Sequence, residues 1–212
     1  MRNETLMDQN LLFLFIPTFF AVSITPGMCM VLAMTLGMTI GIKRSLWMMG
    51  GELIGVGLVA LSALIGVSAL LLTRPNLFLF MKYLGGAYLL YLGIQMWRSL
   101  GKMAIPTTAV EEIDIDRKAL FVQGFITAIA NPKGWAFMIS LLPPFINTNT
   151  DLLPQATQLI AIILCFELTC MLLYATGGKT LRHLLQQQSS VKLLNRIAGT
   201  MMMLVALWLV MS

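Results

Sequence analysis

The chain has 212 residues, of which 58% are hydrophobic and 11% are charged. Soluble domains are usually about 45–50% apolar and about 25% charged, and the mean hydropathy here is +0.85. A water-soluble globule of this size cannot hide so much apolar surface. The composition therefore excludes an ordinary cytosolic enzyme, a disordered protein and a nucleic-acid-binding domain. It predicts an all-α integral membrane protein whose solvent is the lipid bilayer.

Long apolar runs predict six transmembrane helices in a single domain that covers residues 1–212. The expected spans are 11–36, 46–72, 77–97, 120–146, 154–176 and the short run that ends at Met211. A polar connection at 98–119 divides the chain into two sets of three helices. The segment 177–196 has an amphipathic pattern, so we expect it to lie partly in the membrane interface.

Lysine and arginine set the expected orientation in the membrane. With six spans both termini lie on one side, and the turns after the first, third and fifth spans hold most of the basic residues. These are Lys43, Arg44, Arg98, Lys102, Arg117, Lys118, Lys179, Arg182, Lys192 and Arg196. The other side holds Arg2 and Arg74, with Lys82 just inside the third span. The positive-inside rule therefore predicts cytoplasmic turns and two periplasmic termini. The net charge of +5 is scattered and forms no basic stripe, so no nucleic-acid partner is expected.

Matching landmarks in the two halves predict an inverted repeat, with one copy at about 11–97 and the other at about 120–212. The first and fourth spans are each interrupted, at Pro26-Gly27 and at Asn131-Pro132. The second and fifth each carry one glutamate, Glu52 and Glu167. Because each copy has an odd number of spans, the second must be inserted upside down relative to the first.

The interrupted spans are candidate binding elements. A proline inside a helix removes a hydrogen bond, and in lipid the freed backbone groups need protein, water or ligand as partners. Either proline alone could be a packing kink. Two at matched positions, beside Gly27 and Asn131, favour a paired site in which free amides at a half-helix N-terminus bind a carboxylate.

Glu52 and Glu167 are the main candidates for binding or proton coupling, since a carboxylate inside a membrane usually faces a cavity or a partner. Burial favours its neutral form, which would let it exchange protons. Glu167 is nearer the middle of its span, so we expect it to be the more strongly desolvated. Lys133 could pair with either glutamate or hold a substrate carboxylate, and the sequence leaves both alternatives open.

Cysteines and glycines have simpler interpretations. Cys29, Cys165 and Cys170 fit no metal-ligand or disulfide spacing, and the 17 methionines indicate adaptable packing. No metal or cofactor is therefore expected. Hydrolase motifs are missing from the sequence, so we expect no enzyme. Two small-residue motifs, Gly37-x-x-x-Gly41 and Gly51-x-x-x-Gly55, predict helix contacts.

Three stretches resemble the lysine exporter superfamily, the LysE/RhtB group of bacterial amino-acid exporters. They are SITPGMCMVLAMTLGMTIGIKRSLWMMGGELIG at 23–55, YLGGAYLLYLG at 83–93 and FVQGFITAIANPKGWAFMISLLPPFI at 121–146. Pro26 and Gly27 match the family's Pro-Gly element, and the Asn-Pro-Lys element is matched at residues 131–133. Glu52 stands where relatives often have aspartate. The family usually reads Pro-Gly-Pro, whereas this chain has Met28 in third place.

The resemblance implies a secondary transporter of the bacterial inner membrane that exports amino acids or close analogues, by antiport with protons. A six-helix thiol–disulfide electron carrier and a passive channel are the alternatives. The carrier needs a second thiol that the fourth span does not supply. Neither the exported amino acid nor the formation of a homo-oligomer follows from the sequence.

Overall fold

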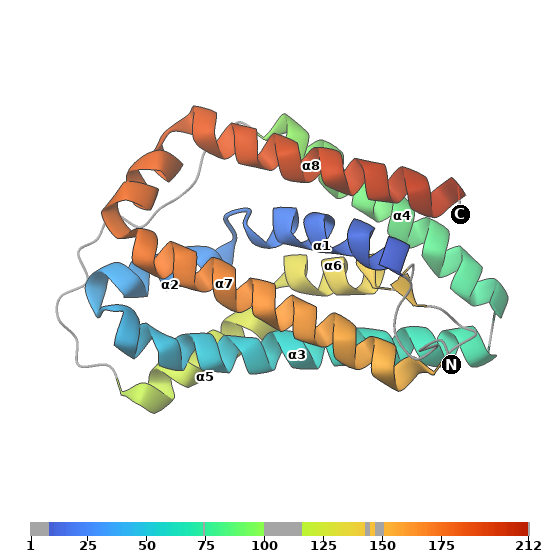
Figure 1. Cartoon of the computed structure of the whole chain (residues 1–212), viewed down its shortest axis with the longest axis horizontal. Helices are drawn as coiled ribbons and strands as arrows, with labels where there is room; N and C mark the ends of the chain where they lie inside the picture. The colour runs from blue at the N-terminus through green and yellow to red at the C-terminus, as the bar shows by residue number, and fades with distance from the viewer. Residues whose placement is uncertain (1–8, 74, 100–115, 143–144, 147–150, 212) are drawn as a thin grey trace.

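The computed structural model describes residues 9–211 except 74, 100–115, 143–144 and 147–150. Within this part of the chain all regular structure is helical (Figure 1). The helices are α1 (Gln9–Ser23), α2 (Met28–Thr39), α3 (Ile42–Thr73), α4 (Pro75–Arg98), α5 (Arg117–Ile129), α6 (Pro132–Leu141), α7 (Leu152–Gln186) and α8 (Gln188–Met211). The all-helical prediction is thus confirmed for the described residues.

Helices are interrupted at both positions that the sequence predicts, and the pair of α1 and α2 is long and apolar enough to form a broken span. α1 and α2 are separated at residues 24–27 and are bent by 55°. α5 and α6 are separated at Ala130 and Asn131. In the segment 177–196, which the sequence predicts to be amphipathic, a kink at the non-helical Gly178 is followed by helix to Gln186, and α8 begins at Gln188.

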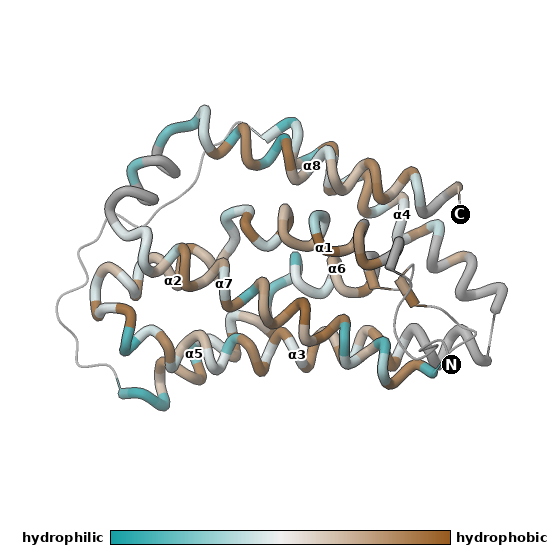
Figure 2. The backbone as a smooth tube through the Cα atoms, viewed as in Figure 1, coloured by the Kyte–Doolittle hydropathy of each residue, from teal (hydrophilic) through white to brown (hydrophobic). Residues whose placement is uncertain are grey.

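Membrane-spanning length is met by three of the described helices on their own. The qualifying stretches are Ile42–Gly66, Leu152–Gly178 and Gln188–Trp208, and the bent pair of α1 and α2 adds a fourth. Many large apolar side chains are exposed, among them Phe13, Ile126 and Leu153. Figure 2 shows apolar residues along the helices and polar residues toward the starts of α5 and α8. Such an apolar exterior is typical of a surface that faces lipid.

Glycines allow two pairs of helices to pack with their backbones in contact. Between α3 and α5, a Cβ atom on Gly51 would overlap the backbone of Phe121, and one on Gly124 would overlap that of Met48. Between α4 and α8, a Cβ on Gly199 would lie 2.6 Å from the carbonyl oxygen of Gly93. The two helices of each pair are therefore packed closely against each other. The predicted contact at Gly51-x-x-x-Gly55 is confirmed, since Gly55 also meets α5.

In the second motif, Gly37-x-x-x-Gly41, the first glycine makes a helix contact and the second lies in a turn. Gly37 meets the backbone of Ala175, so α2 packs closely against α7. Gly41 instead has a φ of +80°, nothing lies within 4 Å of where its Cβ would be, and it lies in the short turn between α2 and α3. A left-handed backbone of this kind strongly favours glycine. The turn folds α3 directly back from the end of α2.

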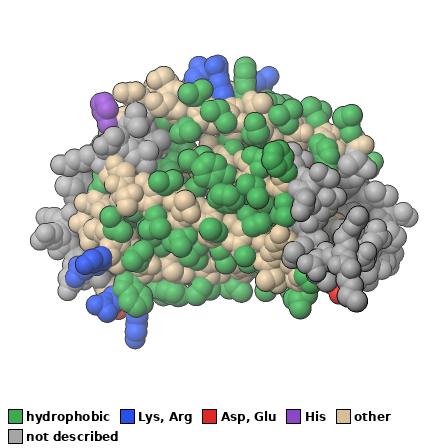
Figure 3. Space-filling model, in the orientation of Figure 1, with side chains coloured by type: hydrophobic (Ala, Val, Ile, Leu, Met, Phe, Trp, Pro, Cys, Tyr) green, Lys and Arg blue, Asp and Glu red, His purple; other side chains and the backbone are tan. Residues whose placement is uncertain are grey.

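Basic side chains on the face in Figure 3 lie in two groups, at the lower left and along the upper edge, with an apolar face between them. The Arg117 guanidinium lies 5.6 Å from the ring centre of Trp47, and that of Arg196 lies 4.8 Å from the ring centre of Trp97. The start of α1 and the end of α8 both lie toward the same end of the molecule (Figure 1).

Candidate functional site

The first helix break is held open by side chains from other helices. Pro26 has no N–H to donate, and Gly27 is extended, with φ −134° and ψ −175°. The Tyr174 hydroxyl of α7 donates to the Ile24 carbonyl at 2.8 Å, and Thr25 Oγ1 donates to Val22 O. The break therefore has partners for the carbonyl groups that a continuous helix would use.

Met28 is the first helical residue after this break. The N–H of a residue in the first turn has no partner within its own helix, so proline is favourable there. Met28 therefore lies at a position where a proline would also suit the start of the helix.

The second break begins α6 with a capped N-terminus. Asn131 Oδ1 accepts a hydrogen bond from the Lys133 backbone N–H at 3.1 Å, and Pro132 occupies the first turn. The Trp135 indole N–H donates to the Ile129 carbonyl at 2.8 Å. Asparagine before proline is a common helix start, which explains why the sequence located this break correctly.

The two breaks face each other across the interior. Lys133 Nζ lies 3.3 Å from Thr25 Oγ1 and 3.5 Å from Val22 O. Asn131 Nδ2 lies 3.5 Å from Cys29 Sγ. The sequence leaves two alternative partners open for the Lys133 ammonium group, a glutamate and a substrate carboxylate. The hydrogen bonds that this group makes in the structure are to residues at the first break. Its charge also interacts electrostatically with Glu167.

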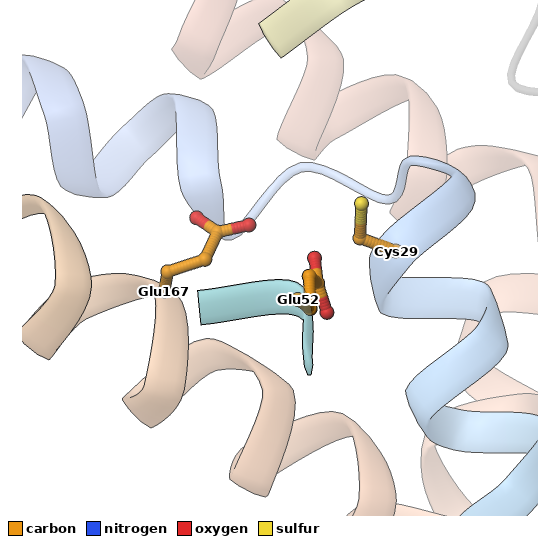
Figure 4. A group of neighbouring side chains, drawn as sticks. All are labelled: Cys29, Glu52 and Glu167. Atoms are coloured by element: carbon orange, nitrogen blue, oxygen red, sulfur yellow. The ribbon is translucent and has the colours of Figure 1, made fainter. Parts of the chain in front are cut away.

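Cys29, Glu52 and Glu167 form a thiol–carboxylate cluster beside the breaks (Figure 4). They come from α2, α3 and α7, and one ligand atom from each lies within 4.8 Å of the other two. Glu52 is fully buried, and both of its oxygens lack a hydrogen-bond partner within the described structure. Glu167 is half-buried. Of the two glutamates, Glu52 thus has the less exposed side chain.

A cavity of about 70 Å³ lies between the breaks. Its polar lining comprises Ser23, Thr25, Gly27, Asn131, Lys133 and Glu167, together with Cys29. Its apolar lining includes Phe19, Val59 and Phe137. One water molecule needs roughly 10–15 Å³ on such a measure, so the cavity has room for a small solute. Glu52, Pro26 and Pro132 are not among the lining residues.

Sequence reasoning missed several members of this site. Ser23 and Thr25 flank the first break, and hydroxyls next to a helix-breaking proline are a usable signal that was not used. Tyr174 lies on the same helical face as Glu167 but had no assigned role. Cys29 was considered only as a redox group, and all three cysteines are free thiols.

Comparisons with known proteins agree with the resemblance seen in the sequence. The family model described as LysE type translocator matches residues 20–212. An uncharacterized membrane protein of Vibrio cholerae is 27% identical over 93% of this chain and 95% of its own length. The homoserine/homoserine lactone efflux protein of Salmonella typhimurium is 28% identical over 91% of this chain and 92% of its own. The leucine efflux protein of an Enterobacter strain is 28% identical over 85% of both. No solved structure matches the chain.

Proposed function

The chain belongs to the LysE type translocators, and from that premise we propose that it exports small amino acids across the bacterial inner membrane by proton antiport. The observation that carries this proposal is the pairing of Lys133 and Glu167 in one cavity between two helix breaks. A free amino acid carries one negative and one positive group. The cavity offers a cation and a carboxylate, one for each.

The substrate carboxylate is assigned to Lys133 and the starts of α2 and α6. Helix N-termini have unpaired N–H groups and a partial positive charge. Gly27 precedes α2, and a Cβ there would lie 3.7 Å from Lys133 Nζ. Glycine thus leaves room for an anion beside the ammonium group. Substrate would replace Thr25 and Val22 as the partners of Lys133.

The substrate ammonium group is assigned to Glu167, because this carboxylate lines the cavity. Glu52 is assigned to the proton. A buried carboxylate without a hydrogen-bond partner has a large desolvation penalty when it is charged, so Glu52 favours the proton-bound form in this conformation.

The cavity size supports a single small amino acid as substrate. Its apolar side, with Phe19, Val59 and Phe137, suits a short neutral side chain. Two relatives support the same class, since their names refer to homoserine and to leucine efflux. We propose neutral amino acids of this size ahead of basic ones, because Lys133 would repel a second positive charge.

The transport cycle is assigned to an inverted repeat of six spans. In this scheme α1–α2, α3 and α4 form the first repeat, and α5–α6, α7 and α8 form the second. The support is that each repeat contains a broken helix, a helix with one glutamate and a helix whose glycine contacts its counterpart. Rocking of one part against the other would expose the cavity to each side in turn.

Export itself is tested by a metabolite comparison. Cells that overexpress the protein and cells that lack it are fed dipeptides, and the free amino acids in the medium are compared. One small neutral amino acid should accumulate outside only the overexpressing cells. The Glu167→Gln variant at the same membrane level is the control, and it should not accumulate that amino acid. Equal concentrations of each free amino acid in the media of all three strains would contradict the export function.

A further inference from the structure

The thiol–carboxylate cluster contains a group that amino-acid export does not use. Cys29 contributes a buried sulfur, only 4% exposed, to a position where two carboxylates also point (Figure 4). The three residues belong to three different helices, so their meeting is a product of tertiary packing. Sulfur and oxygen donors at this spacing form the type of ligand set that binds a metal ion.

Glu52 provides an independent indication of a missing ligand. Buried polar groups in proteins almost always have a hydrogen-bond partner. Both oxygens of this fully buried side chain lack one among the residues that the structure describes. A cation coordinated by one of these oxygens would supply the absent interaction, and it would offset the cost of burying the negative charge.

We propose that Cys29, Glu52 and Glu167 bind a thiophilic divalent metal ion of the Zn²⁺ and Co²⁺ class. Zinc accepts thiolate sulfur and carboxylate oxygen, and a site with three protein ligands keeps a fourth position for water. On binding, the Cys29 thiol gives its proton to water and its sulfur forms the bond to the metal. The sulfur is not oxidised.

The geometry requires a small contraction of the cluster. Metal–ligand bonds of about 2.0–2.3 Å place neighbouring ligand atoms roughly 3.5 Å apart. The observed separations reach 4.8 Å at most, so the side chains must approach by about 1 Å. Rotation about the side-chain bonds of the two glutamates is sufficient for a shift of this size.

Lys133 should lower the affinity of the cluster for a divalent metal ion. Its ammonium group lines the same cavity as Cys29 and Glu167, and its positive charge repels a divalent ion. Replacement of Lys133 by methionine should therefore tighten metal binding. The same replacement should weaken binding of an amino-acid carboxylate, so metal and substrate respond to Lys133 in opposite directions.

A bound metal should inhibit export, because it would occupy Glu167 and block proton access to Glu52. This consequence rests on the proposed function. The binding of the metal does not, since it depends only on the three ligands. The experiment therefore measures binding and transport separately.

Binding is measured by titration of the purified full-length protein in detergent with Co²⁺. Charge-transfer absorption from thiolate to cobalt reports a bond to sulfur. We expect one Co²⁺ per chain and displacement of the signal by Zn²⁺. Cys29→Ser should abolish the absorption, and Glu52→Gln should weaken binding at least tenfold. Cys170→Ser is the matched control, because this buried thiol lies outside the cluster, and it should keep the signal.

The site is refuted if the wild-type protein shows no thiolate absorption, if Cys29→Ser keeps it, or if Cys170→Ser loses it. Size-exclusion profiles establish that each variant is folded. Zn²⁺ is then added to vesicles during amino-acid transport. Cobalt binding without any amino-acid transport would contradict the proposed function alone, whereas transport without cobalt binding would contradict the metal site alone.

Discussion

Glu52 and Glu167 differ in their surroundings although both lie in apolar parts of long helices. Glu52 is fully buried with unpartnered oxygens, and it lies where α3 packs closely against α5. Glu167 borders the cavity together with Lys133. The same side-chain chemistry therefore supports two roles, of which one is exchange of a proton and the other is contact with a solute.

Glu52→Gln removes the titratable proton and keeps the size of the side chain. The variant should be at least as stable to heat as the parent, because glutamine can never become a buried, unpaired charge. Couplings between two ligands are typically about 1–3 kcal/mol, so gradient-driven export should fall about 5- to 150-fold. Counterflow of substrate, which needs no net proton movement, should persist. The measurement is pH-gradient-driven uptake and counterflow in inverted vesicles.

Glu167→Gln is the comparison variant in the same vesicles. It should reduce counterflow as well, because the cavity loses its contact for the ammonium group. Full gradient-driven transport by both variants at matched protein levels would show that neither carboxylate couples substrate to protons.

At the scale of the helices, each break is caused by residues at the break itself and is contacted by side chains that are distant in the sequence. Proline and a capping asparagine interrupt the helices, and Tyr174, Lys133 and Cys29 then contact the freed groups from elsewhere. Closely packed glycine contacts have the opposite effect, because they hold α3 to α5 and α4 to α8 along their length. The helix breaks thus lie between closely packed pairs of helices.

Pro26→Ala restores an N–H at the first break. A helix that continued through this point would consume the amides assigned to the substrate, so export should fall while thermal stability does not. Met28→Pro is the matched control, because proline suits the first turn of α2, and it should export normally with stability raised by up to about 1 kcal/mol. Normal export by the Pro26→Ala variant would mean that the first break is only a packing kink and does not bind the substrate.

Gly124→Ala tests the contact between α3 and α5. The added methyl would overlap the backbone of Met48, and overpacking of this kind costs about 1–3 kcal/mol. Gly66→Ala is the matched change, since nothing lies within 4 Å of the new atom. Thermal unfolding in detergent should show a clear loss for the first variant and none for the second. Equal unfolding temperatures would contradict the close packing of this helix pair.

At the scale of the whole molecule, the distribution of basic residues still predicts the orientation. The exposed Lys118 lies in the first turn of α5, and the exposed Leu153 lies in the first turn of α7. Six spans with cytoplasmic basic turns would place these two positions on opposite sides of the membrane.

Single cysteines at Lys118 and Leu153 test this topology in intact cells. A membrane-impermeant thiol reagent should label Leu153→Cys from outside and should label Lys118→Cys only after permeabilisation. The parent protein, which has one exposed cysteine at Cys165, gives the background. Outside labelling of Lys118→Cys would invert the proposed orientation.

The features that the sequence predicted well are those with local causes. Pro26, Pro132 and Asn131 act on the backbone beside them, and so both breaks were located correctly. The features that it missed depend on packing between distant segments. The contact from Lys133 to Thr25 is one of these. The meeting of Cys29 with Glu52 and Glu167 is another, because a residue's position along a helix does not tell which side chains of other helices it will face.

The junction between α7 and α8 shows a further limit. The apolar run predicts that the fifth span ends at residue 176. The structure has a kink at Gly178, where φ is 45° and ψ is −128°, and helix follows it to Gln186. The apolar run therefore gives the extent of the span but not the structure of the chain beyond it.

The short turn at Gly41 gives α2 the properties of a lever. Only Ile40 and Gly41 separate α2 from α3, so a tilt of α2 about the first break must pull on the beginning of α3, one end of the helix that carries Glu52. Gly37 presses the same lever against α7, which carries Glu167. Any displacement of α2 that a solute caused at the break would therefore reach both carboxylates through helices that are already in contact.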